Sequence, residues 1–448
     1  MITPQMIKQL FLSAVHNVTA HIKDFSLHPG IDFSRTRKLP PDTLIRLLVA
    51  EGASSTRVEL LDFFGFDPDA PTSSAFRQQR AKLRPDAIKE VLDTFNTSLS
   101  GLEPPARCAA PGYRCLAADG STASFYSAPR FSPDSYFVSE GHSAKGFYSV
   151  HVNTLFDMDT HLYMDAFLQP VHEKDEFRAF CSMVDRIPLL PETSDIYIAD
   201  RGYCSYNNMA HVMEKGQYFL FRSKDVLSKG ILKNLGLPTD GTFDRTVTVT
   251  IQRRQSKKIP IPPGSHPRFI GADISFDYVQ YGSDDTYTMT FRAVRIQLPS
   301  GTYECLVTNL SLAQFPPERL AGLYFSRWKI ECAYRDLKYT IGMTSFHSCK
   351  AMHVEQEVYA RLLLYNITEA LVQSTVLEAG NTKHAYQVNF TRAAHICRAF
   401  LRLPPEEGRM NIAALLRKEL VPLRKDRKYP RLQTAHFRKP KYFIYRAA

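Results

Sequence analysis

The sequence predicts a mixed α/β fold, and three observations favour it. Residues 1–100 carry helical periodicity with capping residues, and residues 113–224 alternate short apolar strands with helices. Residues 225–312 lose the helical pattern and become rich in β-branched and aromatic residues, before helical periodicity returns over 313–378. We therefore expect a mixed sheet core (113–224 and 313–378) interrupted by a β-rich insertion, with a helical basic region over 379–448.

Length and composition limit the function classes. A chain of 448 residues is long enough for two or three domains, and its hydrophobic fraction of 44% is ordinary for a globular protein. It has no apolar run of about 18 residues, which excludes a spanning helix, and its N-terminus shows no secretory cleavage pattern. The eight cysteines never occur at CxxC spacing, which argues against zinc and fits a reduced cytosolic compartment.

Positive charge is concentrated near the end of the chain. The net charge is +11, and residues 401–448 hold thirteen Lys and Arg against four acidic residues. A concentrated basic surface predicts a polyanionic partner, with a solvated soluble tail as the alternative.

Residues 1–100 predict a small helical DNA-binding domain. One helix begins near Pro41 and stops at Gly52, a second ends at Gly65, and a third follows the Thr72–Ser74 cap. The third helix is the candidate for insertion into a DNA groove, and an amphipathic helix with a polar outer face is the alternative. The side chains that would contact DNA there are Arg77, Arg80 and Lys82.

A Pro- and Gly-rich linker over 101–112 precedes the predicted core. Its pattern is β-β-β-α-β-α-β, which predicts a mixed sheet. The strands are expected at 113–120, 146–157, 161–170, 194–203 and 218–222, and the helices at 172–187 and 205–215.

Two aspartates, Asp119 and Asp200, each end an apolar run with a glycine close behind. If their strands are adjacent and parallel, the strand ends lie about 4.8 Å apart. Two carboxylates that close repel each other, and a cation relieves the repulsion; carboxylate oxygens suit Mg²⁺ or Mn²⁺. An aspartate before glycine is more often a turn residue, so the pair gains meaning only with a third ligand.

The third ligand lies in the segment YFSRWKIECAYRDLK. Tyr324, Arg327, Glu331 and Lys338 stand at offsets of 0, 3, 7 and 14. At about 100° per residue, a continuous α-helix would place them within a stripe about 60° wide. A carboxylate flanked by a phenol, a guanidinium and an ammonium would present a metal ligand to a phosphate backbone, which predicts two-ion phosphoryl transfer on DNA.

These motifs resemble the DDE transposases of the bacterial insertion-sequence-four family. The chain matches that family's Y-x2-R-x3-E-x6-K signature at all four positions, and ADGST (118–122) and ADRGY (199–203) match as well, within a resemblance over 113–349. The resemblance implies an RNase H-like core. It makes Asp119, Asp200 and Glu331 the catalytic triad that binds two Mg²⁺ or Mn²⁺ ions. Contacts with transposon-end phosphates would come from Tyr324, Arg327 and Lys338.

The resemblance also implies partners and a reaction. The partner would be double-stranded DNA, as transposon ends and as target, and the synaptic complex would hold a homodimer. The protein would cleave the ends, through a hairpin in some relatives, and join the 3′ ends to target DNA. Two alternatives stay open: a nuclease of the same fold without strand transfer, and a domesticated DNA-binding protein without catalysis.

Several residues depart from the family pattern or are weaker candidates. Some relatives stack a tryptophan of the β insertion on a flipped base, but the only tryptophan here, Trp328, lies in the signature and is expected to be a core or helix-packing residue rather than a DNA contact. Tyr303 could stack instead, with packing on a neighbouring strand as the alternative. Arg201 and Lys145 are weaker candidates for phosphate contacts. No metal is assigned to the histidines, which lack regular ligand spacing: His142, His151, His161 and His172.

Overall fold

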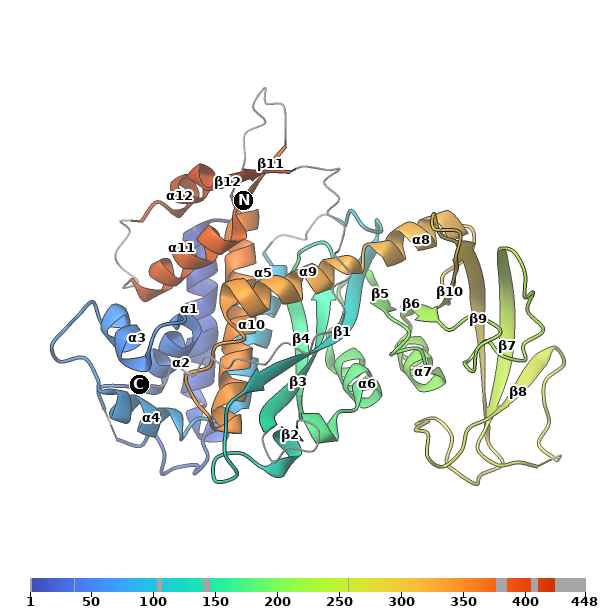
Figure 1. Cartoon of the computed structure of the whole chain (residues 1–448), viewed down its shortest axis with the longest axis horizontal. Helices are drawn as coiled ribbons and strands as arrows, with labels where there is room; N and C mark the ends of the chain where they lie inside the picture. The colour runs from blue at the N-terminus through green and yellow to red at the C-terminus, as the bar shows by residue number, and fades with distance from the viewer. Residues whose placement is uncertain are drawn as a thin grey trace.

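The computed structural model describes residues 2–35, 37–102, 107–139, 146–256, 258–375, 385–403 and 410–423. Helices α1–α5, α10 and α11 gather at one end, the central strands lie in the middle, and β7–β9 form the other end (Figure 1). The helices are α1 (Pro4–Ala20), α2 (Pro41–Ala50), α3 (Thr56–Phe63), α4 (Ser73–Arg80), α5 (Pro85–Ser100), α6 (Glu176–Arg186), α7 (Tyr206–Glu214), α8 (Pro317–Phe325), α9 (Trp328–Asp336), α10 (Ala351–Gln373), α11 (Phe390–Arg402) and α12 (Ile412–Lys418).

The strands and short helical turns complete the described elements. The strands are β1 (Tyr113–Phe125), β2 (Phe137–Ser139), β3 (Gly146–Asp157), β4 (Tyr163–Pro170), β5 (Ser194–Ala199), β6 (Tyr218–Ser223), β7 (Phe243–Gln252), β8 (Ser265–Phe269), β9 (Thr286–Gln297), β10 (Tyr303–Thr308), β11 (Tyr386–Val388) and β12 (Leu420–Pro422). Three 3₁₀ turns are η1 (Ile22–Phe25), η2 (Asp134–Tyr136) and η3 (Val171–Glu173), and η4 (Leu337–Ile341) is a π-helical turn.

One mixed sheet runs through the molecule in the order β2-β3-β1-β5-β6-β10-β9-β7-β8, and β4 also pairs with β3. β1 is antiparallel to β3 and parallel to β5, which is parallel to β6. The mixed α/β fold is therefore confirmed, and the predicted order β-β-β-α-β-α-β is present with the short strand β2 added. A bidentate pair between Arg114 and Asp195, both contacts 2.7 Å and fully buried, stabilises the β1–β5 register.

Alternate residues of the central strands face two different cores. Along β1, Ala117 lies in the core shared with α5 and α10, whereas Ala118 lies in the core shared with α6 and α7. β5 alternates in the same way, with Ile198 on the first side and Ala199 on the second. Because successive strand residues point to opposite faces, continuous apolar runs are needed for a sheet covered on both sides.

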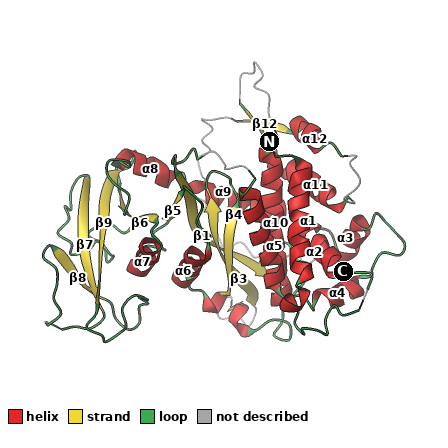
Figure 2. Ribbon diagram, turned by 180° about the vertical axis from the view of Figure 1, so that it is seen from behind, coloured by secondary structure: helices red, strands yellow, loops and turns green. Residues whose placement is uncertain are grey.

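The three helices predicted between residues 39 and 82 are α2, α3 and α4, and α1 and α5 flank them. Their apolar side chains share one core with α10 and with one face of the sheet. Figure 2 shows α1, α2 and α5 beside α10. The N-terminal helices are thus packed onto the rest of the chain, and their role in DNA binding stays a prediction.

The β-rich stretch extends the central sheet. β9 is antiparallel to β7 and β10, β7 is parallel to β8, and β10 pairs with β6. The expected antiparallel module is therefore continuous with the core sheet, and one of its pairs is parallel. Parts of the predicted linker and most of the basic end, including 103–106, 376–384, 404–409 and 424–448, lie outside the described residues. Among the described helices, none has both the length and the apolar character needed to cross a bilayer.

Candidate active site

Asp119 and Asp200 occupy neighbouring positions on adjacent parallel strands. The last residue pair between β1 and β5 is Ala118 with Ala199. Asp119 directly follows Ala118, and Asp200 directly follows Ala199. The condition set from the sequence, adjacent and parallel strands, is therefore met. The prediction that Asp119 ends its strand is wrong, because β3 continues to pair with β1 beyond the end of β5, with Asp119 opposite Thr154.

Local backbone amides hold both carboxylates. Asp119 Oδ1 accepts a hydrogen bond from the Gly120 N–H at 2.9 Å, and Asp200 Oδ1 accepts one from the Gly202 N–H at 2.7 Å. Both aspartates are partly exposed.

The signature segment is not one continuous α-helix. α8 ends at Phe325, Ser326 and Arg327 form a turn, α9 follows, and η4 then widens into a π turn that includes Lys338. Bonds from the N–H groups of Lys329 and Ile330 reach only three residues back across the turn. The ideal stripe calculated from 100° per residue is therefore wrong in detail, because it assumes an uninterrupted helix.

Tyr334 attaches α9 to the strand that carries Asp119. Its hydroxyl oxygen lies 2.8 Å from Thr154 Oγ1, 3.0 Å from the Asp119 carbonyl oxygen and 3.2 Å from the Val152 carbonyl oxygen. The hydroxyl can accept from Thr154 while it donates to one of the carbonyls. Glu331 lies one helical turn before Tyr334, so this contact brings its carboxylate toward the same region of β1.

The charges of the signature segment act on Asp119. Burial raises the pKa of Asp119 to about 6; the Gly120 N–H and Arg327 oppose the rise, and Asp200 and Glu331 add to it. Burial lowers the pKa of Lys338, and the charge of Asp119 partly counteracts that effect. All three predicted ligands and two of the predicted phosphate contacts therefore share one electrostatic environment.

The oxygen donors fit a divalent cation in their chemistry. Three carboxylates of mutually unfavourable charge surround one strand end, and hard oxygen ligands are what Mg²⁺ and Mn²⁺ prefer. Glu331 is held by Arg327, with Oε1 2.7 Å from Nη2. The carboxylate oxygens of Asp119, Asp200 and Glu331 are not all within 4.8 Å of one another. Among the described residues, Glu51, His347 and Glu357 meet that spacing.

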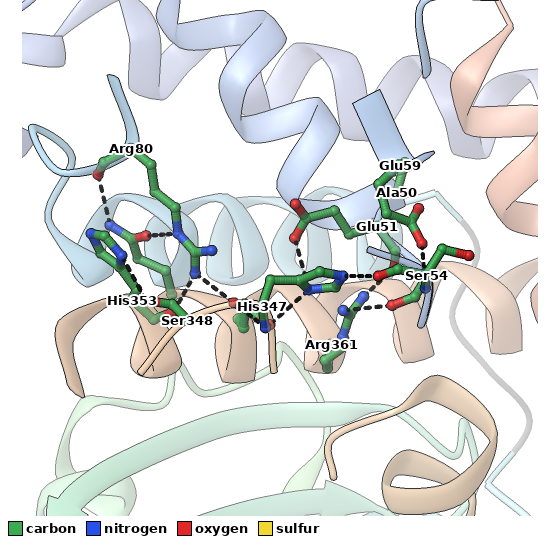
Figure 3. A network of polar contacts seen from close by, with 12 residues as sticks. Ala50, Glu51, Ser54, Glu59, Arg80, His347, Ser348, His353 and Arg361 are labelled. Atoms are coloured by element: carbon green, nitrogen blue, oxygen red, sulfur yellow. Dashed lines mark hydrogen bonds and ion pairs between the residues drawn. The ribbon is translucent and has the colours of Figure 1, made fainter. Parts of the chain in front are cut away.

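Glu51, Arg80, His347, Glu357 and Arg361 form a buried inter-helix network (Figure 3). His347 Nδ1 lies 3.2 Å from Glu357 Oε2 and 3.6 Å from Glu51 Oε2, and Nε2 contacts the Ser54 carbonyl oxygen at 2.9 Å. Arg80 pairs with Glu357, and the charges of Arg80 and Arg361 lower the pKa of both carboxyl groups against the effect of burial. The network joins the N-terminal helices to α10.

Arg80 corrects the prediction for α4. Its side chain is 2% exposed, pairs with Glu357 at 2.9 Å and donates to Gln356 Oε1 at 2.8 Å. Arg80 shares the inner face of α4 with Phe76, one turn earlier, so it cannot enter a DNA groove from this position. Arg77 is exposed and Lys82 is partly exposed, as the prediction requires.

The aromatic and weaker basic candidates lie around two cavities. Trp328 is 47% exposed, which excludes a core position but not packing against a helix, and it lines a cavity of about 970 Å³ with Tyr324 and Arg327. Tyr303 and Arg201 line a second cavity of about 480 Å³. The Arg295 guanidinium lies 4.2 Å from the centre of the Tyr303 ring and covers one of its faces. Lys145 and His142 lie outside the described residues.

Sequence reasoning missed Glu176 and Tyr334, and it gave His151 no role at the site. His151 is buried and its Nε2 lies 3.1 Å from Glu176 Oε1. The His151 ring, followed by Lys174, lowers the pKa of Glu176 to about 2 against the effect of burial. No spacing rule could have found this pair, because β3 and α6 bring together residues 25 positions apart. Tyr334 had a signal, since it stands three residues after Glu331.

Comparison with known proteins places these features in a family. Residues 110–367, more than half of the chain, match the family described as "Transposase DDE domain". A putative transposase of Sinorhizobium fredii (y4zB) is 23% identical over 178 residues, 39% of this chain and 42% of that protein. The InsG transposase of insertion sequence element IS4 from Escherichia coli is 28% identical over 140 residues, 28% of this chain and 31% of that protein.

The alignments with the two relatives cover only part of each protein, and the similarity to a solved structure is low. The chain aligns with less than half the length of these two curated relatives. A solved synaptic complex of the piggyBac transposase with hairpin DNA aligns over 93% of this chain and 86% of its own, with a TM-score of 0.45 and 10% identity.

Proposed function

The chain belongs to the transposase DDE domain family, and on that premise we propose that it binds the ends of a mobile DNA element, cleaves them and joins their 3′ ends to target DNA. The observation that carries the proposal is the convergence of Asp119 and Asp200 on adjacent parallel strands, with α9 bonded to the same strand through Tyr334. The order β4-β3-β1-β5-β6 supports the RNase H-like core implied by the sequence resemblance.

Asp119, Asp200 and Glu331 are the residues that would hold divalent ions, Mg²⁺ or Mn²⁺. When bound, two such ions activate a water or 3′-hydroxyl nucleophile and stabilise the leaving oxygen of an in-line displacement. The protein contributes ligand position: amides fix Asp119 and Asp200, and Tyr334 fixes the helix that carries Glu331.

The cationic side chains are proposed to bind the DNA backbone. Arg327 lines the larger cavity beside Tyr324, and Lys338 lies close enough to Asp119 to interact with its charge. Guanidinium and ammonium groups beside the carboxylates would position the phosphate that is cut and balance its charge.

Further DNA contacts are proposed at a second surface. Arg201, Arg222, Lys224 and Lys229 line the smaller cavity, so they could follow a strand leaving the site. Tyr303 borders the same cavity and would offer a base its ring face not covered by Arg295. Arg77 and Lys82 remain proposed contacts on α4. A homodimer would allow two ends to be cut together.

The test is a cleavage and joining assay with a DNA fragment that carries the inverted repeats flanking the gene. We expect Glu331→Ala to abolish cleavage while it spares end binding, because Glu331 supplies a ligand rather than a DNA contact. Loss of binding in a folded Glu331→Ala protein would contradict that role. Transfer of a labelled 3′ end into a plasmid distinguishes a transposase from a nuclease, which would cut without joining. Unchanged DNA functions in Asp119→Ala would instead indicate a non-catalytic DNA-binding protein.

A further inference from the structure

We propose that Glu176 is a fourth carboxylate ligand of the divalent metal site and that His151 positions it. The inference rests on the proposed function of Asp119 and Asp200 and adds a residue from α6 that the signature motifs do not contain. Glu176 is the first residue of α6, which packs on the sheet face next to β3 and β4.

Gly120 shows how close Glu176 comes to Asp119. A Cβ built on Gly120 would lie 2.8 Å from Glu176 Oε1 and 2.8 Å from His151 Nε2. Gly120 is the residue directly after Asp119, so the Glu176–His151 pair lies against the backbone that carries the first ligand. A side chain at position 120 would displace this pair, which gives glycine a specific reason to stand there.

Gly202 shows how close Glu176 comes to Asp200. A Cβ built on Gly202 would lie 2.9 Å from Asp200 Oδ1 and 3.9 Å from Glu176 Oε2. Glu176 Oε2 and Asp200 Oδ1 are therefore no farther apart than the sum of these two distances. Glu176 therefore lies near the backbone of both predicted ligands.

The two oxygens of Glu176 have different surroundings. His151 Nε2 at 3.1 Å and Lys174 Nζ at 3.0 Å both contact Oε1. Oε2 is the oxygen on the side of Asp200. His151 and Lys174 therefore hold the carboxylate by one oxygen and leave the other on the side of the metal site, as a positioned ligand requires.

An independent observation indicates a missing polar partner here. The Tyr203 side chain is 2% exposed, and its hydroxyl has no hydrogen-bond partner among the described residues. Burial raises the pKa of Tyr203, and charges on Glu176, Tyr334, Asp119 and Asp200 add to the rise, so the hydroxyl lies within the electrostatic reach of the three carboxylates. A buried hydroxyl without a partner is costly, and an ion with its bound water molecules at these carboxylates would supply one.

The proposal is tested by titrating the full-length protein with Mn²⁺ in the absence of DNA and measuring binding by calorimetry. We expect Glu176→Gln to weaken Mn²⁺ binding at least about tenfold, as loss of a ligand or its support does. Glu173→Gln is the matched control, because it removes the same charge from an exposed glutamate three residues away and should change nothing. Glu176→Asp, which keeps the charge on a shorter side chain, should bind more weakly than the unaltered protein and provides a second variant if Glu176→Gln does not fold.

Asp119→Asn separates failure of this proposal from failure of the proposed function. If Asp119→Asn weakens Mn²⁺ binding and both Glu176 variants bind within about twofold of the unaltered protein, Glu176 is no ligand and the proposed function stands. If Asp119→Asn also leaves binding unchanged, the site at β1 and β5 binds no metal and both proposals fail. His151→Gln should weaken binding less than Glu176→Gln, because it removes only the contact that orients Oε1; an effect larger than that of Glu176→Gln would contradict the positioning role.

Discussion

Replacement of Arg80 by alanine is the most direct test of how α4 is oriented. The Arg80 guanidinium lies 2.9 Å from Glu357 Oε1, and the two side chains are 2% and 0% exposed. Its Nε donates to Gln356 Oε1 at 2.8 Å, and Nη2 donates to the His353 carbonyl oxygen. Alanine would remove the ion pair and both hydrogen bonds and leave Glu357 buried with less compensating charge.

The expected cost follows from that burial. Removal of one partner from a buried ion pair costs about 3–5 kcal/mol, because the remaining charge stays desolvated without compensation. His347 and Arg361 still contribute positive charge beside Glu357, which places the expected loss toward the lower end of that range. A loss of about 3 kcal/mol in unfolding free energy is large against typical surface substitutions of about 0.5 kcal/mol.

Urea unfolding followed by circular dichroism measures this loss, and Arg77→Ala is the control. Both substitutions replace arginine by alanine on the same helix, but Arg77 is exposed. We expect a markedly lower urea midpoint for Arg80→Ala and little change for Arg77→Ala, which should instead lose affinity for transposon-end DNA. Equal midpoints, with the affinity loss in Arg80→Ala, would refute the buried orientation and restore Arg80 as a groove contact.

Three further predictions concern the site and its support. Arg327→Ala and Lys338→Ala should each make end binding less dependent on salt, because each removes one phosphate contact. The slope of log K against log salt concentration should fall in magnitude by about one for each variant, and unchanged slopes would argue against phosphate contact. Tyr334→Phe should lower the unfolding free energy by about 1–3 kcal/mol and reduce cleavage more than end binding, because α9 loses its bond to β1; normal cleavage would show that Glu331 does not depend on it. Burial opposes protonation of His347, but Glu51 and Glu357 outweigh it and raise its pKa above 6.5, so its stabilisation is present below that pH and is lost as pH rises through the raised pKa. Urea unfolding should therefore show a destabilisation by His347→Gln that shrinks as the pH rises above 6.5 and through the raised pKa, and a constant difference would contradict it.

The sequence was sufficient for the order of elements in the core. Continuous apolar runs with short turns predicted the strands, and Pro41, Ser55 and Thr72 stand at the beginnings of α2, α3 and α4. The sequence was not sufficient to predict the residue at which each strand ends. Whether β1 stops at Asp119 depends on a partner strand, and β3 continues beside it past the end of β5.

The candidate site was predictable where a motif is local and not where it is assembled by packing. Asp119, Asp200 and Glu331 each stand in a short recognisable motif, and the structure brings Asp119 and Asp200 to neighbouring strands. Glu176 stands in no such motif, since its relation to the site exists only through the approach of α6 to β1. The prediction that Arg80 contacts DNA was wrong because a charged residue was assumed to be exposed. Phe76, one turn earlier, marks the buried face of α4.

The inter-helix network constrains where the signature segment can move. His347 lies in the loop after η4, and its bonds to Glu357 and to the Ser54 carbonyl fasten that loop to α10 and to the N-terminal helices. The Tyr334 contact fastens α9 to β1. Any movement that brings Glu331 closer to the two aspartates must therefore be absorbed within the segment itself. The turn at Ser326–Arg327 and the π turn η4 are the two places where its α-helical hydrogen bonding is already interrupted. Exchange of the Arg327 contact on Glu331 for a DNA phosphate, as proposed above, would release the carboxylate at the first of these places and would link DNA binding to completion of the proposed metal site.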